Sequence, residues 1–419
     1  MSTVRAFPRI PLAAFLVMGL VANVACAMGN SPLQADAPLV RNATPVRPEG
    51  LRFTCAPRQL ERMAVDMPGY LRTLGITSRF VATRRDEAAG TLTYTLTTPN
   101  DDVTTLDFFD RPEFRLADAA VRLPLKNGKT RTVRTASAKE IMLALLQHGR
   151  LTEFSGAACD IDALRDHVGI RQNTVAWAEV LEFGWPEGGP AKWNEKYWKR
   201  GTPKAGHALH VAINDMFLNQ KKYEIGCYTA TKMVMIQGVL DYYNRIKKDR
   251  ATLKLVEARL SVDGEPLVDV EPGRVWDFDP AFDPAERLRP GKLLDVAYDI
   301  APKNFVPGDW AYVLNTDPHS AKKTGYEGSN AVYLGRNKFD DYYNDHNHAY
   351  SYRQKMNEVF QWRHGVFSAS RDAEKLQPLS AQDLERLGAS PDTGGMVLSL
   401  RIAPYRFGYE PLPAWHFNN

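Results

Sequence analysis

The apolar positions between residues 230 and 247 follow a helical period. They recur at Met233, Ile236, Leu240 and Tyr243, with spacings of three, four and three residues. Side chains at such spacings lie on one face of an α-helix. The sequence therefore predicts a helix over residues 227–247 whose apolar face packs against a core.

Cys227 lies on the first turn of this predicted helix, directly after Gly226. The unpaired N–H groups and the dipole at a helix N-terminus favour a thiolate over a thiol, and nucleophilic cysteines commonly occupy this position. A lone cysteine is more often a small buried hydrophobic residue. The local pattern leaves both interpretations open.

Several other segments carry helical or extended patterns. A capping-box spacing at residues 137–140 opens a helix to about His148, and residues 176–181, 193–200 and 207–217 read as short helical segments. Residues 91–97 alternate polar and apolar side chains, as a half-buried strand does. Further strands are expected over residues 103–109, 310–313, 328–335 and 397–402, and in a strand-rich segment that begins near residue 251.

A cysteine helix followed by antiparallel strands predicts an α+β fold. In a papain-like or NlpC-like core, the helix lies on an antiparallel sheet, whose strands supply the base and its orienting group. We expect the following parts along the chain: a signal peptide over 1–27, a linker over 28–50, an N-terminal sheet-containing lobe over 51–135, a catalytic domain with the cysteine helix over 136–370, and a C-terminal extension with a late strand over 371–419.

The first 27 residues have the layout of a secretory signal. Arg5 and Arg9 precede an apolar run, and Ala25-Cys26-Ala27 is a small-residue cleavage site. Cys26 as the acylated residue of a lipoprotein is the less favoured alternative, because Asn23 stands where such a signal has an apolar residue. We expect an exported protein, periplasmic or secreted, without a membrane span in the mature chain.

Export bears on the cysteines, because an oxidising compartment promotes disulfide bonds. The chain has four cysteines, and cleavage after Ala27 leaves Cys55, Cys159 and Cys227. If Cys227 stays free for chemistry, the expected disulfide joins Cys55 to Cys159.

Charge and motifs exclude several function classes. The net charge of +4 is small for 419 residues, and no basic run or RNA motif accompanies it, so we expect no nucleic-acid partner. His346 and His348 lack a cluster of further ligands with metal spacing, which favours a solvated loop over a metal site.

Four blocks in order resemble the bacterial spore-coat type of protein-glutamine gamma-glutamyltransferase, a compact transglutaminase related to NlpC-type cell-wall peptidases. The resemblance covers roughly residues 190–370, with a weaker match back to about 137. The blocks are Asn194–Arg200, Ala212–Phe217, Cys227–Ala230 with the helix through Asp241, and Phe305–Asp309 continuing into Glu327–Gly335. The resemblance implies a protein or peptide glutamine substrate, an amine acceptor, Cys227 as nucleophile and no cofactor.

The sequence departs from this family at two positions. The family has a glutamate directly before its cysteine, where this chain has Gly226, and a catalytic glutamate where it has Ser329. Two residues are candidates to replace the second glutamate. His364, in a displaced His-Gly pair, is the preferred base, and Glu327 ranks second because strand parity directs it to the face of Ser329.

The expected activity is that of an exported cysteine acyltransferase. A thioester forms at Cys227 and is transferred to a lysine amine or to water. One alternative is a peptidoglycan amidase or endopeptidase of NlpC type, acting on cell-wall peptide. Another is a non-catalytic binding protein that retained the scaffold after losing the family glutamate at Ser329.

Overall fold

The structure is a computed structural model of the chain. It describes residues 50–98, 108–186, 190–199, 201–260, 295–298, 304–314, 328–340, 349–352, 354–355, 358, 361, 380–382 and 397–402. The expected signal peptide and nearly all of the expected linker therefore lie outside the described residues.

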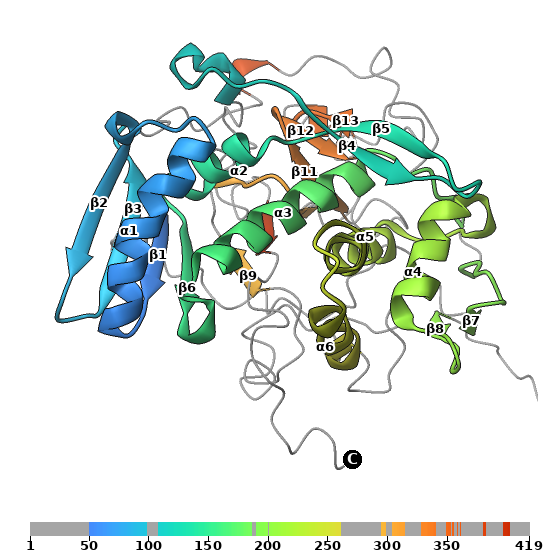
Figure 1. Cartoon of the computed structure of the whole chain (residues 1–419). Coiled ribbons are helices and arrows are strands. Elements are labelled where there is room, and N and C mark those ends of the chain that lie inside the picture. Colours follow the sequence, from blue (N-terminus) through green and yellow to red (C-terminus); the bar gives the residue numbers. More distant parts are fainter. Residues whose placement is uncertain are drawn as a thin grey trace, which may run out of the picture.

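A four-stranded sheet covered by a helix forms one side of the molecule (Figure 1). The covering helix α1 spans Pro57–Thr73 and buries an apolar face. In spatial order the strands are β2 (Val81–Asp86), β3 (Thr91–Leu96), β1 (Gly50–Thr54) and β6 (Leu151–Ser155). Strand β1 runs antiparallel to β3 and parallel to β6. Because β6 follows residue 135, the sheet extends across the domain boundary expected there.

A disulfide joins Cys55, just after β1, to Cys159, just before α3. The two Cα atoms lie 6.0 Å apart, within the range that a disulfide spans without backbone movement. The expected pairing of these two cysteines is confirmed.

A six-stranded antiparallel sheet forms the second layer. In spatial order its strands are β13 (Ala349–Tyr350), β12 (Lys338–Asp340), β11 (Gly328–Gly335), β10 (Trp310–Leu314), β14 (Val397–Ile402) and β9 (Asp295–Tyr298). The strands expected near 310–313, 328–335 and 397–402 are β10, β11 and β14. Two small hairpins pair β4 (Ala119–Pro124) with β5 (Thr130–Thr135) and β7 (Trp198–Lys199) with β8 (Thr202–Pro203).

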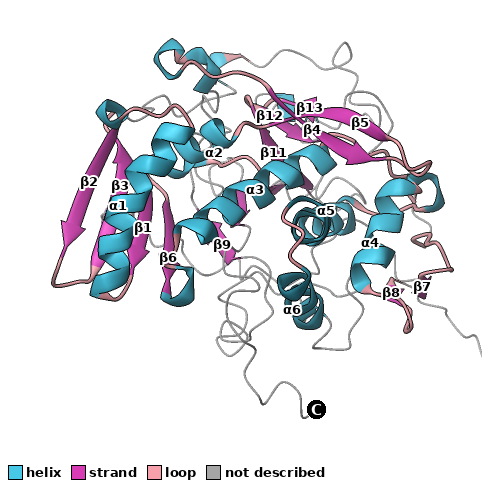
Figure 2. Ribbon diagram, in the orientation of Figure 1, coloured by secondary structure: helices cyan, strands magenta, loops and turns pink. Residues whose placement is uncertain are grey.

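Helices fill the space between and beside the sheets (Figure 2). They are α2 (Ala138–Leu145), α3 (Ile161–Ala178), α4 (Leu209–Leu218), α5 (Cys227–Asp241) and α6 (Arg250–Leu260), with a π-helical turn over Tyr242–Ile246. Short 3-10 helices occupy Ser78–Phe80, Phe108–Asp110, Pro112–Phe114, Gly156–Ala158 and Gln220–Lys222.

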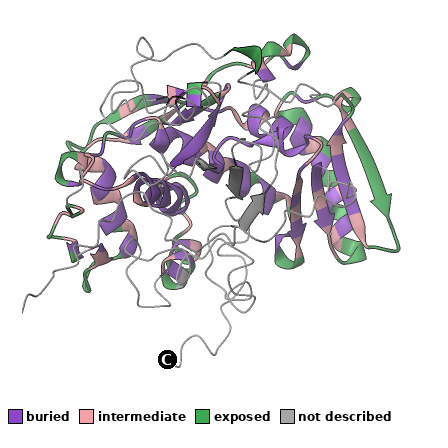
Figure 3. Cartoon of the chain, turned by 180° about the vertical axis from the view of Figure 1, so that it is seen from behind, coloured by how far each residue is buried: buried purple, intermediate pink, exposed green. Residues whose placement is uncertain are grey.

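Helix α5 lies at the centre, in contact with α3, α4, α6 and β11. Nearly all of its residues are buried, whereas the edge strand β2 is exposed (Figure 3). At Gly238 an added Cβ would lie 2.0 Å from Oγ1 of Thr174, so the absent side chain lets α3 and α5 approach closely. This packing fixes the direction of α5, and with it the position of its first residue.

Three local predictions are wrong where the structure describes them. Residues 108 and 109 of the strand expected over 103–109 belong to a 3-10 helix, and residues 103–107 lie outside the described residues. The segment expected to turn strand-rich near residue 251 begins with helix α6, which Asp249 caps by accepting from the backbone N–H groups of Ala251 and Thr252. The short helix expected over 193–200 contains strand β7 instead. In the described part of the chain, no helix is both long and apolar enough to cross a membrane.

Candidate active site

Cys227 is the first residue of α5, and Gly226 is its N-cap. The helix start predicted from the apolar period is therefore confirmed. The Cys227 side chain is buried, with a relative exposure of 7%. The N–H groups of the first helical turn have no partner within the helix, so this end of α5 can stabilise negative charge.

Asn330 of strand β11 reaches the sulfur of Cys227. Its Nδ2 donates to Sγ at 3.5 Å, and its Oδ1 accepts a hydrogen bond of 2.9 Å from the indole Nε1–H of Trp310. An indole nitrogen only donates, so the bond to Trp310 identifies which end of the amide is the oxygen. The NH₂ group is thereby directed at Cys227.

Two aromatic side chains extend this arrangement. The ring of Tyr228 lies 5.2 Å from that of Trp310, and Lys232, also on α5, places its Nζ 5.7 Å from the Tyr228 ring centroid. Lys232 is almost completely buried. The site therefore combines one sulfur, one amide donor and a buried lysine in an apolar setting.

The two faces of β11 contact different parts of the protein. Asn330, Val332 and Leu334 face the core that contains α5, whereas Ser329, Ala331 and Tyr333 face the opposite way. The Oγ of Ser329 lies 3.5 Å from the phenolic oxygen of Tyr350 on that far side. The spacing of two residues between Glu327 and Ser329 therefore gives no reason to expect Glu327 near Cys227.

A hydrogen-bonded loop holds the turn that precedes Cys227. Gly184 donates its N–H to the carbonyl of Tyr223 and accepts from the N–H of Ile225. The Tyr223 hydroxyl donates to Asp215 at 2.6 Å, and Asn194 donates to the same carboxylate at 2.7 Å. Two of the blocks in the family resemblance therefore meet at Asp215, together with Tyr223 of the turn before Cys227.

Asp309, from the fourth block, joins two buried arginines. Its carboxylate accepts from Arg150 at 2.5 Å, from Arg171 at 2.7 Å and from the backbone N–H of Val306 at 2.7 Å. Burial raises the pKa of Asp309, but Arg150 and Arg171 outweigh it and hold that pKa below its usual value. The ionised carboxylate fixes the turn at Gly308 that leads into β10, and so places Trp310.

His167 lies against this cluster and is neutral. Burial lowers the pKa of His167 well below its ordinary value, and the charges of Arg171 and Arg150 lower it further. Its Nε2 accepts a hydrogen bond of 2.8 Å from the Nε–H of Arg171. No pattern in the sequence predicted this group, because its members lie on α3 and in loops far apart along the chain.

The remaining candidate residues are not placed. His364 and Glu327, the two expected bases, and the pair His346 and His348 lie outside the described residues. Cys227 is disulfide-bonded in this structure, so its thiol is not free here. Asn330, by contrast, is a contact that the sequence reasoning missed, although it stands next to Ser329.

The described part of the chain brings no group of three or more His, Cys, Asp or Glu side chains together as a metal site. What the arrangement offers instead is a sulfur at a helix N-terminus beside an amide donor. When Cys227 is reduced, its thiolate can attack an acyl carbon and carry the acyl group as a thioester.

Comparison with known proteins assigns this arrangement to a family. Residues 125–363 match the family model described as protein-glutamine gamma-glutamyltransferase, which is more than half of the chain. Among solved structures, the chain is similar to a transglutaminase from Geobacillus stearothermophilus without its C-terminal extension, at 17% sequence identity. That alignment covers 59% of this chain and 94% of the other, with a TM-score of 0.33. No curated protein matches the sequence.

Proposed function

Because this chain belongs to the protein-glutamine gamma-glutamyltransferase family, we propose that Cys227 is the nucleophile of its acyl-transfer reaction. The chain is an acyltransferase of this kind, and its family acts on protein glutamine side chains and amine acceptors. The observation that supports Cys227 is its position as the first residue of α5, where Asn330 donates to its sulfur.

The reaction proceeds in two steps. The Cys227 thiolate attacks the carboxamide carbon of a glutamine side chain, the C–N bond breaks, and the nitrogen leaves as ammonia after taking a proton. A lysine amine then attacks the thioester carbon and loses a proton, the C–S bond breaks, and the thiolate is regenerated. Attack by water in place of the amine yields a glutamate side chain.

The first-turn N–H groups of α5 are suited to stabilise the oxyanion of each tetrahedral intermediate. Asn330 favours the thiolate, since a hydrogen bond to the charged form of a group stabilises that form. We retain His364 as the preferred base and Glu327 as the second candidate. His364 is a conventional partner of a nucleophilic cysteine. Glu327 ranks second because its spacing from Ser329 no longer supports it, since Ser329 faces away from Cys227.

We also propose that the protein is exported and cleaved after Ala27, which places it in the periplasm or outside the cell. Support comes from the charged start, apolar run and Ala25-Cys26-Ala27 of the leader. Cleavage removes Cys26, so the mature chain keeps Cys227 as its one cysteine beside the Cys55–Cys159 disulfide. N-terminal sequencing of exported protein is expected to begin at Met28, and a lipid-modified Cys26 would contradict this.

The activity test uses mass spectrometry of the purified protein with a glutamine donor peptide and a labelled amine. Amine incorporation with release of ammonia is expected for the unaltered chain and not for folded Cys227→Ala. Release of stem-peptide fragments from purified cell-wall sacculi would favour the alternative of a peptidase acting on cell-wall peptide. A reduced Cys227 that does not react with iodoacetamide at neutral pH would favour the non-catalytic alternative.

A further inference from the structure

Trp310 contacts the strand and the helix that meet at Cys227. It is the first residue of β10 and is fully buried. In the register of the sheet Trp310 is opposite Val332, which makes Asn330 its diagonal neighbour on the same face of β11. Diagonal neighbours in antiparallel strands are within reach of an aromatic side chain. The indole Nε1–H of Trp310 accordingly donates to the side-chain oxygen of Asn330 at 2.9 Å.

The same indole packs against the start of α5. The rings of Trp310 and Tyr228 lie 5.2 Å apart, and their planes are inclined by 58°. Tyr228 follows Cys227 directly along the chain. Trp310 is therefore in contact both with the residue that reaches the sulfur and with the residue next to the cysteine.

The turn before Trp310 is held at its backbone and at a side chain. The N–H of Gly308 donates to the carbonyl of Tyr333 at 2.8 Å, and the N–H of Tyr333 donates to the carbonyl of Asp309 at 2.9 Å. Two buried arginines bind the carboxylate of Asp309. The indole thus extends from a fixed turn, which fixes the direction of its N–H.

The two ends of the Asn330 amide differ chemically, since the oxygen accepts hydrogen bonds and the NH₂ group donates them. The protonation state of the sulfur decides which end it prefers. A thiolate only accepts, so it pairs with the NH₂ group, whereas a neutral thiol can donate weakly and can pair with the oxygen. An amide that is free to turn would serve either form of Cys227.

Trp310 removes this choice, because an indole nitrogen only donates. Turning the amide would break its bond to the indole and place the NH₂ group against the indole N–H, so that two donors face one another. Asn330 and Trp310 are both almost completely buried, so water has little access to replace the lost bond. An unmade hydrogen bond between buried groups costs free energy, which holds the amide in its observed orientation.

From this geometry we propose that Trp310 is a positioning residue, which makes the Asn330 amide stabilise the thiolate of Cys227 and not the thiol. The inference rests on the proposed function, in which Cys227 is the nucleophile. Trp310 acts through Asn330, and none of its own bonds forms or breaks in the reaction. The consequence is that reduced Cys227 keeps a larger fraction of thiolate at neutral and mildly acidic pH.

The test is the pH dependence of Cys227 alkylation by iodoacetamide in the reduced full chain, followed by mass spectrometry of the peptide that contains Cys227. Trp310→Phe keeps an aromatic ring but removes the donor. Its alkylation midpoint is expected to rise by about one pH unit, which is a tenfold lower ratio of thiolate to thiol. Benzothienylalanine at position 310 retains both fused rings and lacks only the N–H, and it is expected to give the same shift. This second variant decides the result if Trp310→Phe does not fold.

A double-variant cycle separates positioning from a purely structural effect. If Trp310 acts through Asn330, adding Trp310→Phe to Asn330→Ala leaves the midpoint of Asn330→Ala unchanged within about 0.3 pH unit. An equal shift by Trp310→Phe with and without the Asn330 side chain would overturn the proposal. So would an unchanged midpoint in both ring variants.

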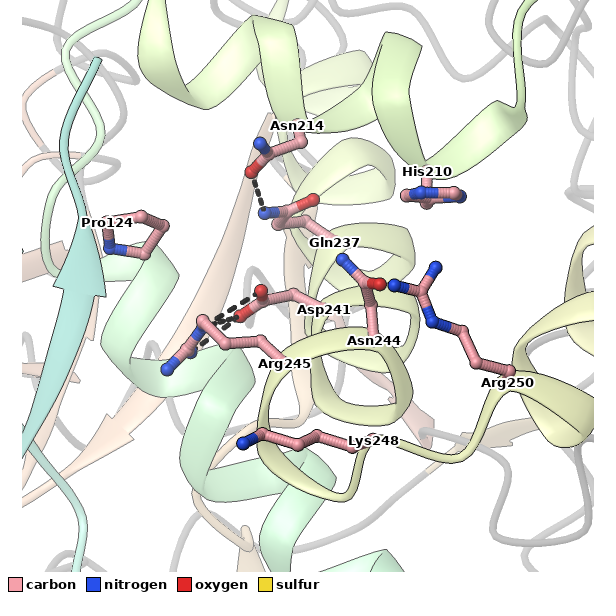
Figure 4. A pocket seen from close by; sticks show the side chains of 9 residues that line it. All are labelled: Pro124, His210, Asn214, Gln237, Asp241, Asn244, Arg245, Lys248 and Arg250. Carbon is pink, nitrogen blue, oxygen red and sulfur yellow. Dashed lines mark hydrogen bonds and ion pairs between the residues drawn. The ribbon is translucent and has the colours of Figure 1, made fainter. Parts of the chain in front are cut away.

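Trp177→Phe is the matched control. The indole of Trp177 is also buried, and it donates to a side-chain oxygen of Asp241 at 2.8 Å. Asp241 ends α5 fourteen residues after Cys227, which is about 21 Å along an α-helix. Figure 4 shows its carboxylate bound to Arg245 in the wall of a pocket there. The control loses a comparable hydrogen bond and is expected to keep the alkylation midpoint of the unaltered chain.

The alkylation readout does not depend on the proposed transfer reaction, because it needs only a reactive thiol. Amine incorporation into a glutamine peptide is measured alongside it. If the midpoints shift as expected while the unaltered chain incorporates no amine, the effect of Trp310 on the thiolate stands and the proposed function fails. If the unaltered chain incorporates amine while the ring variants keep their midpoints, the positioning role fails and the proposed function stands.

Discussion

The side-chain amide of Asn330 donates to the sulfur of Cys227 over 3.5 Å. Its neighbour Ser329 is one residue away and faces the opposite side of β11, toward Tyr350. The family resemblance led us to expect the counterpart of a catalytic glutamate at Ser329, yet the contact with the cysteine is made at Asn330. This contact supports a part for Asn330 in the proposed reaction, which is to stabilise the thiolate of reduced Cys227.

Asn330→Ala is expected to make Cys227 less reactive at neutral pH. Loss of one hydrogen bond to the thiolate removes about 1.5–3 kcal/mol of stabilisation from the charged form, so the midpoint of iodoacetamide alkylation against pH rises by one unit or more. Ser329→Ala is the matched control, because its side chain lies on the other face of the same strand, and its profile is expected to stay unchanged. Equal midpoints in Asn330→Ala and the unaltered chain would contradict the assignment.

The second prediction concerns the base. His364→Ala is expected to reduce amine incorporation nearly as far as Cys227→Ala, because a nucleophile and its base act as a unit. Adding His364→Ala to Cys227→Ala should then cost little more. Glu327→Gln is expected to cost less than His364→Ala. If the order is reversed, Glu327 is the base.

Removal of the Cys55–Cys159 disulfide is expected to destabilise the protein. It closes a loop with a sequence separation of 104 residues. In the chain-entropy model such a crosslink contributes about 4–5 kcal/mol by restricting the unfolded chain. Urea unfolding of Cys55→Ala with Cys159→Ala, compared with the unaltered chain under non-reducing conditions, measures this. A loss below about 1 kcal/mol would show that the crosslink has little effect on stability.

Stability is expected to fall as the pH drops below about 6.5, because of His167. The folded state keeps this histidine neutral, with a lowered pKa, whereas the unfolded state regains an ordinary pKa and binds a proton. The unfolded state therefore binds more protons in this range, and one such group changes stability by about 1.4 kcal/mol per pH unit. The stabilising effect is complete above the unfolded pKa and is lost as the pH falls toward the folded one.

Urea unfolding at pH 7, 6 and 5 of the unaltered chain and of His167→Gln measures this contribution. Glutamine keeps an acceptor for Arg171 but does not titrate in this range. The difference in slope between the two proteins is the expected signal. Parallel stability curves would mean that His167 does not couple folding to pH.

The sequence by itself determined the elements whose side chains follow a clear period. The helix that begins at Cys227 and strand β3 were found because their apolar side chains recur at the spacing of a helix or of a strand. Strand β10 was found from the turn at Pro307 and Gly308 that precedes it. The Cys55–Cys159 pair followed from counting cysteines once Cys227 was set aside. The N-terminal part of α3 was not predicted, because this helix buries polar residues such as His167, Arg171 and Asn173, which conceal the apolar period.

Only the tertiary structure decided how these elements form a site. Which face of β11 meets α5 depends on its register with β10, so the distinction between Ser329 and Asn330 could not be read from their order in the chain. The ion pairs of Asp309 with Arg150 and Arg171 join residues more than 130 positions apart. Side chains brought together by packing leave no periodic signal, because their positions along the chain are unrelated.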